Sequence, residues 1–285
     1  MPAAPAAFGT RLGAAIAERG RLCVGIDPHA SLLHGWGLGD DAAGARELGL
    51  RVVDAAAGRA AAVKPQAAFF ERHGAAGYAA LEEVLVAARA AGLVVIADAK
   101  RGDIGSTVEA YGEAWLRPGS PLESDAMTVV AYQGVGSLDA VRSAAAGWGK
   151  GLFVLAATSN PESAATQRAR REDGATVAAA VVDGVAAWNT GAVPQAPADG
   201  ALGSFGVVIG ATVDLAERGI AADRLAGMPV LAPGFGFQGA RIADGPAVFG
   251  AASSSVLVVT ARAVLQGGPA GLADAIGAAA REAAW

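Results

Sequence analysis

The feature of this 285-residue sequence that most constrains its fold is the alternation of short apolar runs with alanine-rich segments. One such segment, at 77–92, carries Leu81, Val84, Leu85 and Ala88 at helical spacing. The apolar runs are continuous rather than alternating, which is typical of parallel strands covered on both faces. The runs read RLCVGID, AAVKPQ, LVVIADAK, DAMTVVAY, GLFVLAATS, FGVVIGAT, PVLAPG and SVLVVTAR.

Eight such units predict a (β/α)8 TIM barrel, whose typical length is about 250 residues. A doubly wound open sheet is the alternative, although it usually has fewer strands in a domain. Phe8, Leu12 and Ile16 lie four residues apart and predict an extra N-terminal helix that covers the barrel floor. We expect 1–285 to be a single barrel domain. The Pro- and Gly-containing sequence within about 160–204 favours a loop insertion over a second domain.

Composition limits the class of protein. Hydrophobic residues make up 53% of the chain and charged residues 17%, so a large core can form and wholesale disorder is excluded. The net charge of −5 and the absence of a Lys/Arg-rich block argue against a nucleic-acid partner. Cys23 is the only cysteine, which excludes a disulfide framework. The sequence shows neither a signal-peptide pattern nor a run of roughly 18 apolar residues, so we expect a cytoplasmic protein with no membrane partner.

Polar residues end several of the apolar runs, at the positions where barrel enzymes hold their active sites. These residues are Asp27, Lys64, Asp98, Lys100, Thr158, Ser159, Asn160, Thr260 and Arg262. Alternate residues of a strand point the same way, so Asp98 and Lys100 should both face the barrel mouth, whereas Asp103 lies in the turn that opens the next helix. Asp103 could be only a helix cap, and Lys100 only a solvated lysine. Their place at a strand end, beside a second lysine on the neighbouring strand, favours a functional role.

The stretch DAKRGDIGST at 98–107 matches the signature D-x-K-x-x-D-[IV]-x-x-T of the orotidine 5′-phosphate decarboxylase family. Further stretches occur in the family's order: RLCVGIDPH, VKPQAAFFE, ATSNPES, PGFGFQG and VVTARAVL. Together they resemble the long-form bacterial branch over nearly the whole chain. The short form has a glycine where Ala261 stands here.

This resemblance implies a (β/α)8 homodimer with shared active sites, and decarboxylation of orotidine 5′-monophosphate to uridine 5′-monophosphate without metal or cofactor. It implies an alternating charged network of Lys64, Asp98, Lys100 and Asp103, with Lys100 as proton donor. It also implies that Asp27 binds the ribose, Thr107 contacts it from the neighbouring subunit, Ser159 recognises the pyrimidine, and Gln238 and Arg262 hold the phosphate.

The chemistry suits such a network. Loss of CO2 from C6 of the pyrimidine leaves a carbanion in the ring plane, where the π system cannot delocalise it. The site must therefore supply a fixed positive charge and a proton at that carbon. Aspartates on both sides would stabilise the charge of Lys100, each by about 4 kcal/mol at 4 Å with an effective dielectric near 20.

Other interpretations stay open at this point. Gly234–Gly239 also fits G-x-G-x-x-G, but no acidic residue ends the following strand as a dinucleotide fold requires, so we favour a phosphate loop beside Arg262. A sugar-phosphate decarboxylase or aldolase shares D-x-K-x-x-D but needs Mg²⁺ and further carboxylates. A non-catalytic nucleotide-binding barrel is the third possibility. The three histidines show no shared spacing and resemble no metal triad.

Overall fold

A computed structural model describes residues 5–190 and 202–285 of the chain. Eight parallel strands form a closed barrel in sequence order, because β8 pairs with β1. The strands are β1 (Leu22–Ile26), β2 (Ala62–Pro65), β3 (Val94–Arg101), β4 (Ala126–Val129), β5 (Gly151–Ala157), β6 (Phe205–Ile209), β7 (Val230–Pro233) and β8 (Val256–Thr260). The predicted (β/α)8 fold is confirmed.

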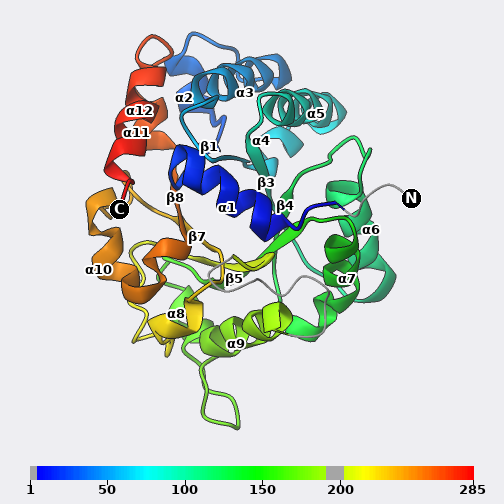
Figure 1. The fold of residues 1–285 in the computed structure, drawn as a ribbon. Helices are drawn as coiled ribbons and strands as arrows, with labels where there is room; N and C mark the ends of the chain where they lie inside the picture. The colour runs from blue at the N-terminus through cyan, green and yellow to red at the C-terminus, as the bar shows by residue number, and fades with distance from the viewer. Residues whose placement is uncertain (1–4, 191–201) are drawn as a thin grey trace.

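Helices surround the ring of strands (Figure 1). The α-helices are α1 (Phe8–Arg19), α2 (Ala30–Gly35), α3 (Ala42–Ala56), α4 (Ala67–Glu71), α5 (Gly74–Ala90), α6 (Gly105–Leu116), α7 (Asp139–Gly147), α8 (Ser163–Gln167), α9 (Val177–Thr190), α10 (Gly245–Phe249), α11 (Arg262–Leu265) and α12 (Leu272–Glu282). Short 3-10 helices are η1 (Val135–Leu138), η2 (Ala222–Leu225), η3 (Ile242–Asp244) and η4 (Gly250–Ser255). The connection from β6 to β7, all of whose residues the structure describes, contains the short 3-10 helix η2 and no α-helix, so the alternation of strands with α-helices is interrupted there.

The segment around 160–204, expected to be a loop insertion, contains α8 and α9 in its described part. Residues 191–201 of that prediction lie outside the described residues.

The extra N-terminal helix lies across one end of the barrel, as predicted (Figure 1). Phe8, Leu12 and Ala15 of α1 are buried against the side chains that fill the barrel. The Phe8 ring meets Phe153 edge-on, with 5.9 Å between ring centroids. Gly151 makes this contact possible, since a Cβ at that position would lie 2.3 Å from the Phe8 ring. The helix therefore closes the barrel floor and leaves the opposite end for a site.

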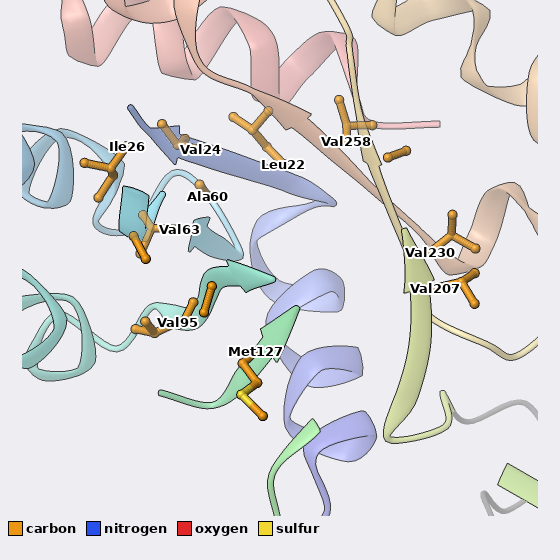
Figure 2. Close-up of a cluster of buried hydrophobic side chains, with 14 of the residues drawn as sticks. Leu22, Val24, Ile26, Ala60, Val63, Val95, Met127, Val207, Val230 and Val258 are labelled. Carbon is orange, nitrogen blue, oxygen red and sulfur yellow. The ribbon is translucent and has the colours of Figure 1, made fainter. Parts of the chain in front are cut away.

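Strand residues divide between two apolar clusters according to the side of the barrel they face. The interior cluster holds Cys23, Ala61, Ala62, Val94, Ile96, Ala126, Phe153, Val208, Leu231, Leu257 and Val259. The outer cluster packs the strands against the surrounding helices, and Figure 2 shows strand residues of this set such as Val24, Val63 and Val95. Burial raises the pKa of the interior Cys23 thiol to about 12, which disfavours the reactive thiolate form.

Both faces of the strands are thus buried, which explains why their sequences are continuously apolar. No helix within the described ranges is both long and apolar enough to cross a bilayer.

Candidate active site

On β2 and β3, the side chains that face the barrel interior change from apolar to charged at the mouth of the barrel. On β2, Lys64 follows the interior residue Ala62. On β3, Asp98 follows Val94 and Ile96 at the same two-residue spacing. Successive side chains of a strand alternate between its two faces, so this spacing places both charged groups inside the barrel, above its apolar filling.

Asp98 is the centre of the charged network. Its Oδ2 lies 2.5 Å from Lys64 Nζ, and its Oδ1 lies 2.6 Å from Lys100 Nζ. Asp98 and Lys64 are buried, whereas the Lys100 side chain is 43% exposed. Lys100 Nζ also donates to Gln66 Oε1 at 3.2 Å, so the ammonium is held between β3 and the end of β2 while part of it faces solvent.

Electrostatics keep the buried pair charged. Burial by itself would lower the pKa of Lys64, but the negative charges of Asp98 and Asp27 outweigh burial and hold that pKa above its ordinary value. Burial by itself would raise the pKa of Asp98, but Lys64 and Lys100 outweigh it and hold that pKa well below its ordinary range. The mouth therefore presents two cations and one carboxylate in fixed positions.

One expected member of the network, Asp103, and the expected ribose contact, Thr107, lie elsewhere. Asp103 forms no ion pair with Lys64 or Lys100, and its Oδ1 accepts the backbone N–H of Ile104 at 2.8 Å. Thr107 is exposed on the first turn of α6. Within one chain, the structure brings together Lys64, Asp98 and Lys100 but does not bring Asp103 or Thr107 to them.

A cavity of about 90 Å³ opens beside the charged network. It is lined by Asp27, Lys64, Pro233, Gly234, Phe237, Gln238, Val259, Ala261 and Arg262. Asp27 Oδ1 is buried there without a hydrogen-bond partner in the described structure, which leaves an acceptor for a ligand hydroxyl. Ser159 Oγ, from the end of β5, donates to Gln238 Oε1 at 3.3 Å. The residues expected to bind the base (Ser159), the ribose (Asp27) and the phosphate (Gln238 and Arg262) therefore lie at the same end of the barrel.

The Arg262 guanidinium is placed by an aromatic contact rather than by an ion pair. Its carbon lies 3.8 Å from the centroid of the Phe237 ring. Among the residues that the structure describes, no carboxylate pairs with Arg262, so its charge is available to an anion. Phe237 is 59% exposed and was not predicted as a site residue, although an aromatic residue inside a glycine loop was a usable signal.

The loop after β7 needs its glycines. Gly234, Gly236 and Gly239 have φ of 111°, 81° and 100°, a region that favours glycine. A Cβ on Gly236 would also lie 2.6 Å from the Ala263 side chain. Ala261 replaces the glycine of the short form, and its φ of −130° is open to alanine. The Ala261 methyl group lies against Gly25, since a Cβ added to Gly25 would be 2.7 Å from the Cβ of Ala261.

Across residues 5–190 and 202–285, no three His, Cys, Asp or Glu side chains gather in a way that could hold a metal ion. Both oxygens of Asp98 are already occupied. Oδ2 accepts from Lys64, and Oδ1 accepts from Lys100 and Thr128. These donors are cations and a hydroxyl, which is the environment of a lysine–carboxylate network rather than of a divalent cation.

Comparisons with known proteins show the family of this chain. The family model of the Orotidine 5′-phosphate decarboxylase / HUMPS family matches residues 20–273. Orotidine 5′-phosphate decarboxylase of Salinispora arenicola is 52% identical over 262 residues, covering 92% of this chain and 91% of that protein. The Streptomyces coelicolor enzyme of the same name is also 52% identical, over 263 residues, with the same two coverages.

A crystal structure from Streptomyces avermitilis assigned to orotidine 5′-phosphate decarboxylase has a TM-score of 0.90 and 50% identity. The alignment covers 98% of this chain and 95% of that one. The family model covers most of the chain, and the relatives named above are about half identical to it in sequence. The chain belongs to the orotidine 5′-phosphate decarboxylase / HUMPS family.

Proposed function

We propose that this protein decarboxylates orotidine 5′-monophosphate to uridine 5′-monophosphate and CO2 in pyrimidine biosynthesis, with Lys100 as the proton donor. The observation that carries the proposal is the pair of lysines on one buried carboxylate. Lys64 and Lys100 contact different oxygens of Asp98, and Lys100 is the more exposed of the two lysines.

The reaction breaks the bond between C6 of the pyrimidine and its carboxylate. The electron pair stays on C6 as CO2 leaves, and the Lys100 ammonium delivers a proton to the same carbon. A cation held near C6 before the reaction stabilises the developing negative charge without reorganisation of solvent. Asp98 near the substrate carboxylate disfavours the charged substrate more than neutral CO2, although preorganised charge is the main contribution.

The other site residues bind the parts of the nucleotide that do not react. The unpaired Oδ1 of Asp27 suits a ribose hydroxyl. Ser159 and Gln238, joined across the mouth, suit the polar edge of the pyrimidine and the phosphate side respectively. Arg262 over Phe237 suits the phosphate dianion.

We infer that the working form is a homodimer with shared sites. The single chain leaves Asp103 and Thr107 outside its own charged network. Asp103 lies on the β3–α6 connection and Thr107 on the first turn of α6, with the exposed Ile104 between them. In the proposed dimer, this connection completes the partner's site with a second aspartate beside Lys100 and a hydroxyl at the ribose.

The test is to add orotidine 5′-monophosphate in the presence of EDTA and to follow the loss of its ultraviolet absorbance. Rapid turnover supports the proposal. Turnover only after addition of Mg²⁺, or turnover of a sugar phosphate instead, would favour the metal-dependent activity considered above. Binding of the nucleotide without turnover would refute catalysis and favour a nucleotide-binding barrel.

A further inference from the structure

A third side chain contacts both Asp98 and Lys100, and the sequence did not point to it. Thr128 lies on β4, two residues after the interior residue Ala126, and it is 1% exposed. Its Oγ1 accepts the backbone N–H of Lys100 at 2.9 Å and donates to Asp98 Oδ1 at 2.9 Å. One buried hydroxyl therefore joins the backbone of one charged residue to the carboxylate of the other.

The direction of both hydrogen bonds is fixed by chemistry. A backbone N–H can only donate, so Thr128 accepts from Lys100. An ionised carboxylate can only accept, so Thr128 donates to Asp98. A hydroxyl can donate one hydrogen bond and also accept one. The Thr128 hydroxyl uses its donor for Asp98 and its acceptor for Lys100.

The backbone at Lys100 explains why this hydroxyl is needed. Among the described residues, Lys100 is the only non-glycine residue with positive φ, at 48°. The register of β3 against β4 shifts at the same place, since Ala97 pairs with Met127 and Arg101 with Val129. Three residues of β3 therefore lie opposite Thr128 alone, and the N–H of Lys100 is bound by the Thr128 side chain instead of by a backbone carbonyl.

We propose that Thr128 is a positioning residue, which holds the unusual backbone of Lys100 and the carboxylate of Asp98 in one fixed arrangement, so that the ammonium of Lys100 meets C6 of the substrate. This inference rests on the proposed decarboxylation, because it concerns the geometry of the same site. Thr128 acts through Lys100 and Asp98, and substrate contact is no part of its role.

Two substitutions separate the hydroxyl from the shape of the side chain. Thr128→Val keeps the branched shape and removes the hydroxyl. It leaves the Lys100 N–H unpaired and removes one of the two hydrogen bonds that Asp98 Oδ1 accepts. Thr128→Ser keeps the hydroxyl and removes only a methyl group. A role in packing would make the serine variant the poorer one, whereas a positioning role makes the valine variant the poorer one.

The chain also offers a matched control at Thr176. This threonine is 5% exposed, and its hydroxyl also bridges two groups. It accepts the N–H of Ala179 and donates to the backbone carbonyl of Arg218. Thr176→Val therefore removes the same kind of bridge without contact with the charged network.

The first measurement is kcat and KM for orotidine 5′-monophosphate. Displacement of a catalytic group by about 1 Å can cost roughly 100-fold in rate, so we expect Thr128→Val to lower kcat by about 10- to 100-fold with KM little changed. Thr128→Ser should recover most of kcat, and Thr176→Val should retain kcat even where its melting temperature falls. A valine variant with the wild-type kcat, or a serine variant as slow as valine, would overturn the proposal.

The second measurement needs no substrate. The unfolding free energies of Thr128→Val, Asp98→Ala and the double variant form a cycle that reports whether the two side chains interact, because alanine leaves no oxygen to accept the Thr128 hydroxyl. We expect the double variant to lose less stability than the sum of the single losses. If the losses of unfolding free energy were additive, Thr128 and Asp98 would not interact, and the proposal would be wrong. A wild-type chain that fails to turn over orotidine 5′-monophosphate would instead refute the proposed function, while the cycle still decides whether Thr128 and Asp98 are coupled.

Discussion

At the scale of single residues, the site depends on a carboxylate whose two oxygens are shared among a buried lysine, an accessible lysine and a hydroxyl. The buried Lys64 compensates the charge of Asp98, and in the proposed reaction Lys100 donates the proton. Removing one partner of such a buried pair leaves an uncompensated charge, which is strongly destabilising.

Lys100→Ala tests the proton donor. The substitution removes both the proton and the cation beside C6, so we expect kcat to fall by roughly 10⁴-fold or more. The Lys100 side chain is 43% exposed, so the variant should fold with a melting temperature near that of the wild type. A folded variant that retains a tenth of wild-type turnover would contradict the assigned role.

Arg262→Ala tests the phosphate contact. The variant should lose about 2–5 kcal/mol of transition-state binding, measured as kcat/KM for orotidine 5′-monophosphate. Orotidine without its phosphate is the control substrate and should react equally with the variant and the wild type. Equal kcat/KM for the phosphorylated substrate in both proteins would show that Arg262 does not hold the phosphate.

The lowered pKa of Asp98 predicts an acid limb of stability. Its folded-state pKa lies below the ordinary value of 3.8, so its contribution is complete above that value and is lost as the pH falls through the folded-state pKa. Urea unfolding between about pH 5 and about pH 2, on either side of that ordinary value, should therefore show a steeper loss of unfolding free energy in the wild type than in Asp98→Asn. Parallel curves for the two proteins would contradict the shift.

At the scale of elements, α1 determines which end of the barrel is open. Its apolar face closes the floor, so the strand carboxyl ends are left as the accessible mouth. The loop after β7 has a second local role, since its left-handed glycines carry Phe237 and Gln238 to the edge of the cavity.

Leu12→Ala tests how much α1 stabilises the fold. Leu12 is fully buried against the barrel interior, so its truncation should cost about 2–5 kcal/mol of unfolding free energy. Gly13→Ala is the matched control on the same helix, because a Cβ there meets nothing within 4 Å, and it should be neutral or stabilising by up to about 1 kcal/mol. Equal effects of the two substitutions would mean that α1 does not cap the core.

At the scale of the whole molecule, the question is whether two chains share each site. The test is to mix the variants Lys100→Ala and Asp103→Ala, each expected to be inactive alone, under conditions that exchange subunits. In a mixed dimer with shared sites, one site combines the intact Lys100 of one chain with the intact Asp103 of the other. Random exchange makes half of the dimers mixed, so about a quarter of all sites should recover activity.

If Asp103 serves its own chain, every site keeps one lesion and the mixture stays as inactive as the separate variants. Mixing each variant with itself is the control for activity regained by the exchange procedure alone.

Much of this architecture follows from the sequence by itself. The recurrence of apolar runs predicted the barrel, because strands buried on both faces must be apolar throughout. The spacing of Phe8, Leu12 and Ile16 predicted the capping helix, and the D-x-K-x-x-D stretch predicted the charged end of β3. These features are local or periodic, so they can be read without knowing which strands are neighbours.

The tertiary structure decided the rest, because it alone sets distances between residues far apart in sequence. It made Lys64 a partner of Asp98, placed Arg262 over Phe237, and left Asp103 outside its own network. Thr128 resembles any polar residue in an apolar strand until the shifted register of β3 places its hydroxyl beside Lys100. Strand pairing across the barrel depends on the closure of the whole sheet, and no local pattern encodes that closure.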